Sequence, residues 1–142
     1  MKIRDIMTSQ VVRIGAMEPA EVAARMLTHY NIGVLPVCGE DGRLCGVVTD
    51  RDLVTRCMAP GRIAGKVKVC DLMTPRVVTV GPDMEVSAAA HLMGREQVRR
   101  LPVVENGRLC GMVSLADLAN MENGGLEAAV ALSDITNHIC KK

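Results

Sequence analysis

Apolar runs and helix-period stretches alternate along this chain of 142 residues. Three short runs rich in β-branched and aliphatic residues, at 11–14, 34–38 and 44–48, predict strands. Between the first two runs, apolar residues recur at helical spacing from Ala20 to about Tyr30. A second helix is expected from about Asp50 to Met58. The order is strand, helix, strand, strand, helix.

The same succession occurs a second time. Asp5-Ile6-Met7-Thr8 returns as Asp71-Leu72-Met73-Thr74, at an offset of 66 residues (71 minus 5). The Leu-Pro-Val strand and the Gly-Arg-Leu-Cys-Gly strand also return. The second copy predicts a strand at 77–80, a helical face on Val86, Ala89, Ala90 and Met93, a tight hairpin at Asn106-Gly107, and a helix from about Leu115 to Met121.

The duplication predicts an α+β fold of two βαββα units followed by a C-terminal helix. We place the first unit at 1–60, a linker at 61–68, the second unit at 69–123 and the terminal helix at 124–142. Proline and glycine end the helix before the linker, and the basic residues after them indicate a solvated segment. Two units can bury their open sheet faces against each other.

An apolar stripe marks the terminal helix. Its members are expected to be Ala128, Leu132, Ile135 and Ile139. The stripe can pack on its own domain or on a second subunit, and the sequence leaves both alternatives open.

Each copy contains a sharp strand-to-helix corner with the pattern Gly-x-x-Thr/Ser-x-x-Asp. Thr49 and Ser114 suit the N-cap of a helix, and Asp52 and Asp117, three residues on, can accept from the cap amide as in a capping box. The amides of a helix start favour an anion or a polar ring substituent. The alternative is that each pattern only caps its helix.

Composition excludes several classes of function. The net charge is +1, and the chain has no Trp or Phe and one Tyr. Such a chain lacks both a polyanion-binding surface and base-stacking platforms, which argues against nucleic-acid binding. No apolar run approaches the roughly 18 residues of a membrane span, and the N-terminus does not resemble a secretory signal. We expect a cytoplasmic protein that does not bind membranes.

Cysteine and histidine suggest no metal or catalytic centre. The six cysteines show no C-x-x-C spacing, and Cys38, Cys45, Cys70 and Cys110 lie in apolar runs that suit buried thiols in a reducing compartment. A zinc or redox site is the alternative. The histidines, His29, His91 and His138, are scattered. No nucleophile–base pair or glycine-rich phosphate loop stands out, so we expect neither catalysis nor a bound metal.

The doubled motifs resemble a known family. Asp-hydrophobic-Met-Thr, a Val-Val strand, Leu-Pro-Val and Gly-x-x-Thr/Ser-x-x-Asp, all repeated in order, are similar to a stand-alone tandem pair of cystathionine-β-synthase (CBS) domains, the Bateman module. The resemblance covers residues 1 to about 121. It implies two units about a pseudo-two-fold axis, with clefts between them that bind AMP, ADP, ATP or S-adenosylmethionine as regulatory ligands. It also implies a homodimer and a signal passed to a separate effector protein or through the oligomeric state.

The resemblance also implies which residues bind the ligand. The motif aspartates, Asp52 and Asp117, would hold ribose hydroxyls, as the acidic residue of dinucleotide-binding folds does. Thr49 and Ser114 would lie near ribose or phosphate. The residues around each Leu-Pro pair would line the clefts, and the Met-Thr turns with the strands after them would enclose the base. These two groups are Gly33, Val34, Leu35, Arg99, Arg100 and Leu101, and Thr8, Val12, Thr74 and Val78.

The two copies differ at the predicted site. The second offers Arg99 and Arg100 where the first offers Gly33 and Val34, whereas the first carries Arg51 inside its Thr-x-x-Asp. An arginine fork suits a phosphate, although two arginines can also form a solvated strand edge. We therefore expect two clefts that differ in affinity or ligand, or a single occupied one. The alternative function is a dimerisation and interaction scaffold that binds no ligand.

Overall fold

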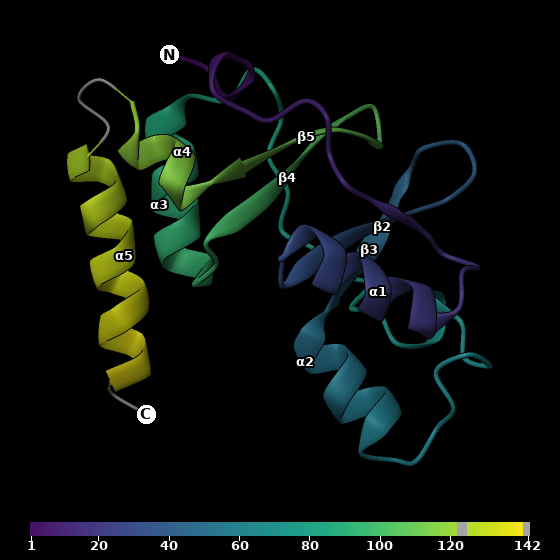
Figure 1. The fold of residues 1–142 in the computed structure, drawn as a ribbon. Coiled ribbons are helices and arrows are strands. Elements are labelled where there is room, and N and C mark those ends of the chain that lie inside the picture. Colours follow the sequence, from purple (N-terminus) through teal and green to yellow (C-terminus); the bar gives the residue numbers. More distant parts are fainter. Residues whose placement is uncertain (122–124, 141–142) are drawn as a thin grey trace. The chain divides into compact units, whose positions relative to one another are not determined.

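A computed structural model describes residues 1–121 and 125–140, without the side chains of 125–127 and 137–140. The chain forms two compact units (Figure 1). One consists of residues 12–77. The other combines residues 1–11 with the chain from Val78 onward. Each unit is described by itself below.

The unit formed by residues 12–77 has a three-stranded sheet with the order β1-β2-β3. β1 runs parallel to β2, and β2 and β3 form an antiparallel hairpin. Its elements are β1 (Ile14–Gly15), α1 (Ala20–Tyr30), β2 (Val34–Cys38), β3 (Leu44–Thr49), α2 (Asp50–Asp52), the π-helix η2 (Leu53–Met58) and the 3-10 helix η3 (Val69–Asp71). The expected helix from Asp50 is therefore present, but it widens to π-helical turns after Asp52.

The other unit repeats this plan. β4 and β5 form an antiparallel hairpin, and Val80 pairs in parallel with Val103 at the position where Ile14 pairs with Val37 in β1 and β2. Its elements are the 3-10 helix η1 (Ile3–Asp5), α3 (Val86–Glu96), β4 (Arg100–Glu105), β5 (Arg108–Ser114), α4 (Leu115–Ala119) and α5 (Gly125–Cys140). The predicted βαββα order and the α+β class are confirmed.

The strands expected at 11–14 and 77–80 are shorter than the β-branched runs that predict them. Only Ile14, Gly15 and Val80 pair with a neighbouring strand. Val12 and Val78 instead pack against the hydrophobic cores of their units. The apolar residues of these runs are therefore explained by packing against the core, and strand pairing begins only at the last residue of each run.

The leading Met-Thr segment of each repeat pairs with the sheet of the other repeat. Thr8 exchanges two backbone hydrogen bonds of 2.9 Å with Met112 in β5, and Thr74 exchanges bonds of 2.8 and 3.0 Å with Val47 in β3. Residues 1–11 therefore belong to the same compact unit as the second repeat. The boundaries predicted from the sequence, 1–60, 61–68, 69–123 and 124–142, follow the repeats and not these compact units. They stay a prediction.

Two glycines make this edge pairing possible. A Cβ added at Gly46 would lie 2.5 Å from the carbonyl oxygen of Thr74, and one at Gly111 would lie 2.5 Å from Met7 Sδ and 3.1 Å from the carbonyl oxygen of Thr8. These are the glycines that open the Gly-x-x-Thr/Ser-x-x-Asp motif. Its first position therefore serves a close backbone approach.

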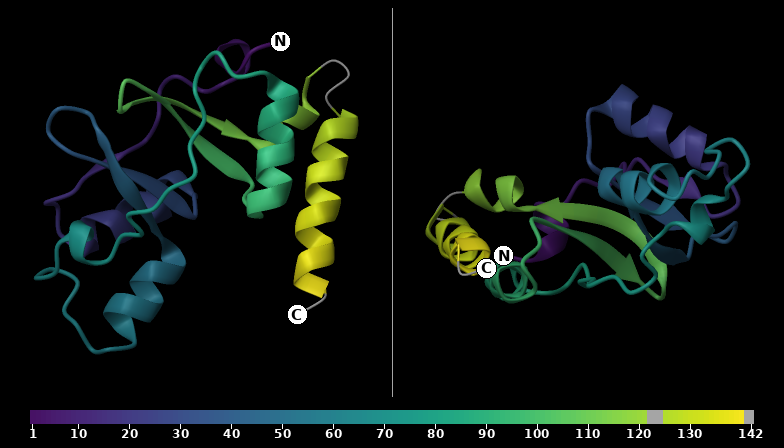
Figure 2. Two further views of the ribbon diagram at one scale, coloured as in Figure 1. Left: turned by 180° about the vertical axis from the view of Figure 1, so that it is seen from behind. Right: turned by 90° about the horizontal axis from the view of Figure 1, so that it is seen from below.

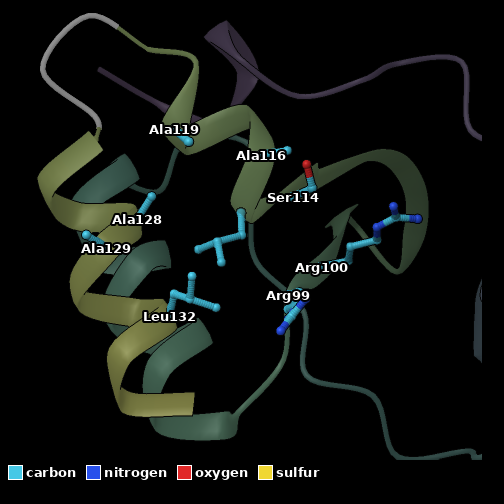
Figure 3. A pocket seen from close by; sticks show the side chains of 9 residues that line it. Arg99, Arg100, Ser114, Ala116, Ala119, Ala128, Ala129 and Leu132 are labelled. Carbon is cyan, nitrogen blue, oxygen red and sulfur yellow. The ribbon is translucent and has the colours of Figure 1, made fainter. Parts of the chain in front are cut away.

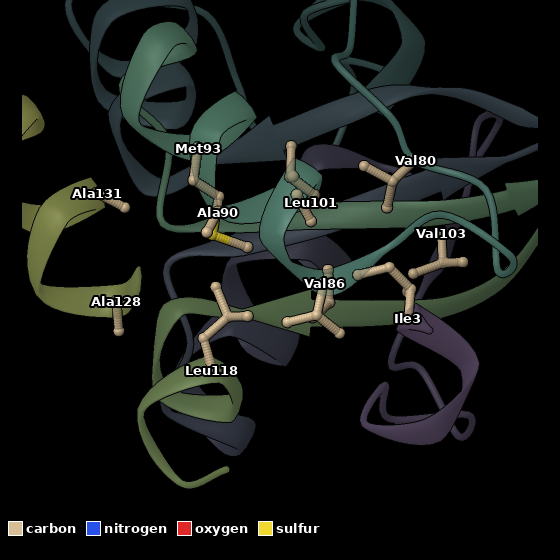
Figure 4. Close-up of a cluster of buried hydrophobic side chains, with 12 residues drawn as sticks. Ile3, Val80, Val86, Ala90, Met93, Leu101, Val103, Leu118, Ala128 and Ala131 are labelled. Carbon is tan, nitrogen blue, oxygen red and sulfur yellow. The ribbon is translucent and has the colours of Figure 1, made fainter. Parts of the chain in front are cut away.

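The cores of the two units use equivalent residues. Val37 and Val48 are fully buried in the unit of residues 12–77, and Val103 and Val113 are fully buried in the other. In the second unit β4 and β5 pack against α3 through Leu101 and Met93, and Ile3 of the N-terminal segment joins the same cluster (Figure 4). Flexible aliphatic and methionine side chains fill the space that aromatic rings occupy in other cores.

The helix α5 lies alongside α3 and α4 of its own unit (Figures 1 and 2). Its buried residues are Ala128, Ala131 and Ile135. Gly94 of α3 lies at this contact, where an added Cβ would lie 3.0 Å from Asp134 Oδ2 and 3.4 Å from Ala131 Cα. The expected stripe is wrong at Leu132, which is 40% exposed because Ala131 takes the position against α3. The side chain of Ile139 lies outside the described residues.

The segment expected to be a solvated linker is partly packed. Val67 is buried, and the carbonyl oxygens of Ala64 and Val67 accept the amides of Glu21 and Ala20. Pro19, at the N-cap of α1, contributes no side-chain hydrogen bond. The start of α1 therefore takes its acceptors from the linker backbone, which fixes the end of the linker in place.

We predict that Gly46→Ala destabilises the protein more than Gly111→Ala does. The added methyl group at position 46 meets a backbone carbonyl, whereas at position 111 its nearest neighbour is the flexible end of Met7. Overpacking of this kind costs roughly 1–3 kcal/mol. Urea unfolding of both variants would measure the difference. Gly81→Ala is the control, since nothing lies within 4 Å of a Cβ there; equal midpoints for Gly46→Ala and Gly81→Ala would contradict the prediction.

Candidate functional site

Both strand-to-helix corners close as capping boxes. In the first repeat the Asp52 amide donates to Thr49 Oγ1 at 3.1 Å, and the Thr49 amide donates to Asp52 Oδ2 at 3.0 Å. In the second the Asp117 amide donates to Ser114 Oγ at 3.1 Å, and the Ser114 amide donates to Asp117 Oδ2 at 2.8 Å. An aspartate therefore fills the place that glutamate or glutamine usually takes.

The sheet register brings each corner against the start of the preceding strand. Thr49 pairs with Val34, and Ser114 pairs with Arg100. The bond from the Leu115 amide to the Arg99 carbonyl, at 2.8 Å, ties the first residue of α4 to the residue before β4. The amide of Asp50 makes the equivalent bond to Gly33, at 3.1 Å. Two groups of predicted site residues, far apart in sequence, thus meet in each repeat.

These bonds change the expected chemistry of the helix starts. The first helical amide of each corner donates to the carbonyl of the residue before a strand, and the third donates to the cap hydroxyl. In the first repeat the amide of Arg51 also donates to Asp50 Oδ1, at 2.8 Å. Our expectation of helix amides free to bind an anion is therefore wrong for most of these groups, because the corner satisfies them internally.

The two motif aspartates have different surroundings. Asp52 is only 7% exposed, and its Oδ1 lies 3.8 Å from Arg56 Nε. Arg56 also donates to the carbonyl oxygens of Leu72 and Met73, so this aspartate helps to fix the Met-Thr segment. Asp117 is half-buried, and no ion pair to it occurs in the described part of the chain.

The remaining predicted residues divide between the two units. Leu35 and Leu101 have no exposed surface and belong to the cores, so the structure does not offer them to a ligand. The predicted set is distributed as Val12, Gly33, Val34, Leu35, Thr49, Arg51, Asp52 and Thr74 in one unit, and Thr8, Val78, Arg99, Arg100, Leu101, Ser114 and Asp117 in the other.

A pocket of about 520 Å³ adjoins the corner of the second repeat (Figure 3). Three predicted residues line it, namely Arg99, Arg100 and Ser114. Asp117 does not belong to the lining, although its neighbour Ala116 does. Sequence reasoning missed six lining residues, which are Leu115, Ala116 and Ala119 of α4 and Ala128, Ala129 and Leu132 of α5.

Small side chains explain why a pocket forms in this repeat. Ala116 and Ala119 of α4 take the places that Arg51 and Val54 hold in the first repeat, at an offset of 65 residues (116 minus 51). The alanines leave room between α4 and α5. The replacement of large residues in the first copy by alanines in the second is the sequence signal that could have identified these α4 lining residues.

The pocket is positively charged at one end. Arg99 and Arg100 are exposed, and neither forms an ion pair with any residue in the described ranges. The opposite wall is apolar, with Leu115 and Leu132 the largest side chains of the lining. Such an arrangement suits a ligand that has an anionic group and an apolar or aromatic body.

The five cysteines whose side chains the structure describes are free thiols with different degrees of burial. Cys38 and Cys57 are buried, while Cys45, Cys70 and Cys110 are half-buried, so full burial is confirmed for Cys38 alone among the four predicted. Burial raises the pKa of the Cys38 and Cys110 thiols. Among the described residues no three His, Cys, Asp or Glu side chains come together as a metal site.

A family model for the CBS domain matches residues 3–59 and again 69–124. The chain belongs to the CBS-domain family. The two matches confirm the tandem CBS pair, and its leading segments are those exchanged between the two repeats. No helix among the described residues has the length and hydropathy needed to cross a membrane.

Curated relatives include CBS-domain proteins of similar length. The CBS domain-containing protein YhcV of Bacillus subtilis is 38% identical over 117 residues, which cover 82% of this chain and 82% of that protein. Hypoxic response protein 1 of Mycobacterium tuberculosis is 36% identical over 116 residues, covering 82% and 81%.

Solved structures show the same fold. A crystal structure of Hypoxic Response Protein I with two coordinated zinc ions has a TM-score of 0.78 at 34% identity, and the match covers 86% of this chain and 99% of that one. The CBS domain pair of the protein MJ0100, in complex with 5′-methylthioadenosine and S-adenosylmethionine, has a TM-score of 0.71 at 27% identity, covering 84% and 97%.

We predict that Asp52→Ala destabilises the fold more than Asp117→Ala does. Loss of an N-cap interaction costs roughly 0.5–2 kcal/mol. At position 52 the substitution also removes a nearly buried side chain and leaves Arg56 without its partner, a further 1–3 kcal/mol or so. Urea unfolding would compare these variants with Glu40→Ala at an exposed loop position. If Asp52→Ala were as stable as Glu40→Ala, the capping role would be contradicted.

Proposed function

We propose that the pocket beside α4 binds an adenosine-containing ligand, an adenine nucleotide such as AMP, ADP or ATP or else S-adenosylmethionine, and that the protein is a regulatory module. The observation that carries this proposal is a pair of arginines at a pocket of about 520 Å³, neither of which forms an ion pair with the residues that the structure describes. The adenosyl ligands in the CBS pair of MJ0100 support the ligand class.

The pocket chemistry suits each part of such a ligand. Arg100 would bind a phosphate or carboxylate group through its planar guanidinium. The apolar wall would hold the adenine ring. Asp117 uses Oδ2 for the cap, which leaves Oδ1 to accept a ribose hydroxyl. Thr8, at the edge of β5 in the same unit, is a further candidate contact.

We infer that the second repeat binds more tightly than the first. The first repeat has Gly33 and Val34 in place of the arginines, and its aspartate is nearly buried against Arg56. The protein would act in the cytoplasm, and its output would pass to a separate effector protein or through a homodimer. The zinc ions of Hypoxic Response Protein I belong to that relative, and we propose no metal for this chain.

Thermal unfolding in the presence of AMP, ADP, ATP and S-adenosylmethionine tests the proposal. A ligand that binds the native state at a hundred times its dissociation constant adds about 2.7 kcal/mol to the free energy of unfolding. We expect at least one of these compounds to raise Tm, and Arg100→Ala to abolish the rise. Arg108→Ala, which removes an exposed arginine from the start of β5, is the control and should retain it. If none of the four compounds changes Tm, the proposal is overturned.

The alternative function, a dimerisation scaffold, is favoured by an exposed apolar surface on the unit of residues 12–77. Val54 is 52% exposed and Met58 is 72% exposed, one helical turn apart on η2. Ile63, in the linker, is exposed as well. Exposed apolar groups in such a cluster are typical of contact sites for another protein.

If this surface joins two copies of the chain, Met58→Lys weakens the homodimer. A charge placed in an apolar interface loses its hydration without a partner. Light scattering at micromolar concentration should then give the mass of a monomer for Met58→Lys and of a dimer for the unaltered chain. Met17→Lys, at a methionine that is 64% exposed, is the control. A monomeric unaltered chain would count against both the dimer and the scaffold.

A further inference from the structure

The terminal helix α5 stands outside both CBS matches, which end at residue 124, and yet it forms one wall of the pocket. We propose that α5 is part of the ligand site and determines which ligands fit. Leu132 and Ala128 supply the apolar wall, and Ala129 sets the width of the opening. This inference rests on the proposed function, and it adds a contact that the CBS repeats themselves do not provide.

The geometry of α5 separates its packing residues from its pocket residues. Ala131 and Ile135 bury almost completely in the unit, and Ala128 lies at the border of both sets. Leu132 follows Ala128 by one helical turn and faces the same space (Figure 3). A ligand in the pocket would cover the exposed apolar surface of Leu132.

The pocket therefore has three distinct surfaces from three parts of the chain. β4 and the residue before it bring the arginines, α4 brings the small residues of the floor, and α5 brings the apolar wall. A ligand that fits must place an anionic group near Arg99 and Arg100 and a compact apolar or aromatic body near Leu132. An adenosyl compound with a charged 5′ substituent has this shape.

Contact with the ligand also couples α5 to occupancy of the site. A ligand that touches α5 binds more tightly when the helix is docked, and by linkage the docked helix is more populated when the ligand is bound. The helix joins α4 through a short connection, from Ala119 to Gly125. Occupancy would thus be reported by the local opening of α5, which amide hydrogen exchange measures.

Isothermal titration of the full chain with ATP and with S-adenosylmethionine tests the inference. Val130 provides a matched control, since it lies on α5 with 44% exposure and does not line the pocket. Leu132→Ala should raise the dissociation constant of the compound that binds about tenfold, because that compound loses an apolar contact. Val130→Ala should bind as the unaltered chain does. Melting without ligand should show that both variants are folded.

A second pair of variants tests the width of the pocket. Ala129→Trp should fill the opening and weaken binding by tenfold or more, whereas Val130→Trp should leave it unchanged. The chain has no other Trp, so tryptophan fluorescence reports the surroundings of each new side chain. Slower hydrogen exchange of amides 128–136 on addition of the probe is also expected.

The outcomes separate this inference from the proposed function. If the unaltered chain binds a probe through Arg100 but Leu132→Ala and Ala129→Trp bind it equally well, α5 is no part of the site and only this inference fails. If the unaltered chain binds neither ATP nor S-adenosylmethionine, this inference is overturned, and the melts with all four compounds decide the proposed function.

Discussion

The corner between the second strand of each hairpin and the following helix is the constraint on which the rest of the site depends. Its capping box fixes the helix start, and the first helical amide donates to the carbonyl of the residue before the neighbouring strand, which fixes the start of that strand. In the second repeat this arrangement holds Ser114, Arg99 and Arg100 in one place. Because the corner satisfies its own amides, it acts as a rigid frame, and the side chains around it supply the binding chemistry.

Local patterns in the sequence predict most of this fold. The helix from Ala20 to Tyr30 and the β2–β3 hairpin are found where periodicity places them. Asn106 and Gly107 both have positive φ, as a two-residue hairpin with Asn-Gly requires. Each of these features depends on residues close together in the chain, which is why a single sequence is enough to reveal them.

Features that depend on distant residues were not predicted. The exchange of the Met-Thr segments pairs Thr8 with Met112, and nothing near either residue in sequence indicates a partner so far away. The buried face of α5 differs from the predicted stripe, because Ala131 and not Leu132 lies at the contact with Gly94 of α3. For the site, the corner and the arginines were predicted, whereas the wall from α5 requires the packing of two helices that the sequence does not specify.

The duplication gives two similar frames, and unequal side chains give them different surroundings. At equivalent positions the first repeat has Arg51 and Val54 and the second has Ala116 and Ala119. The helix α5 follows the second repeat in sequence, and it packs on α3 and α4 of its own unit. The equivalent surface of the first repeat keeps Val54 and Met58 exposed. The second copy thus has a pocket lined by α4 and α5, and the first copy has an exposed apolar surface at the equivalent position.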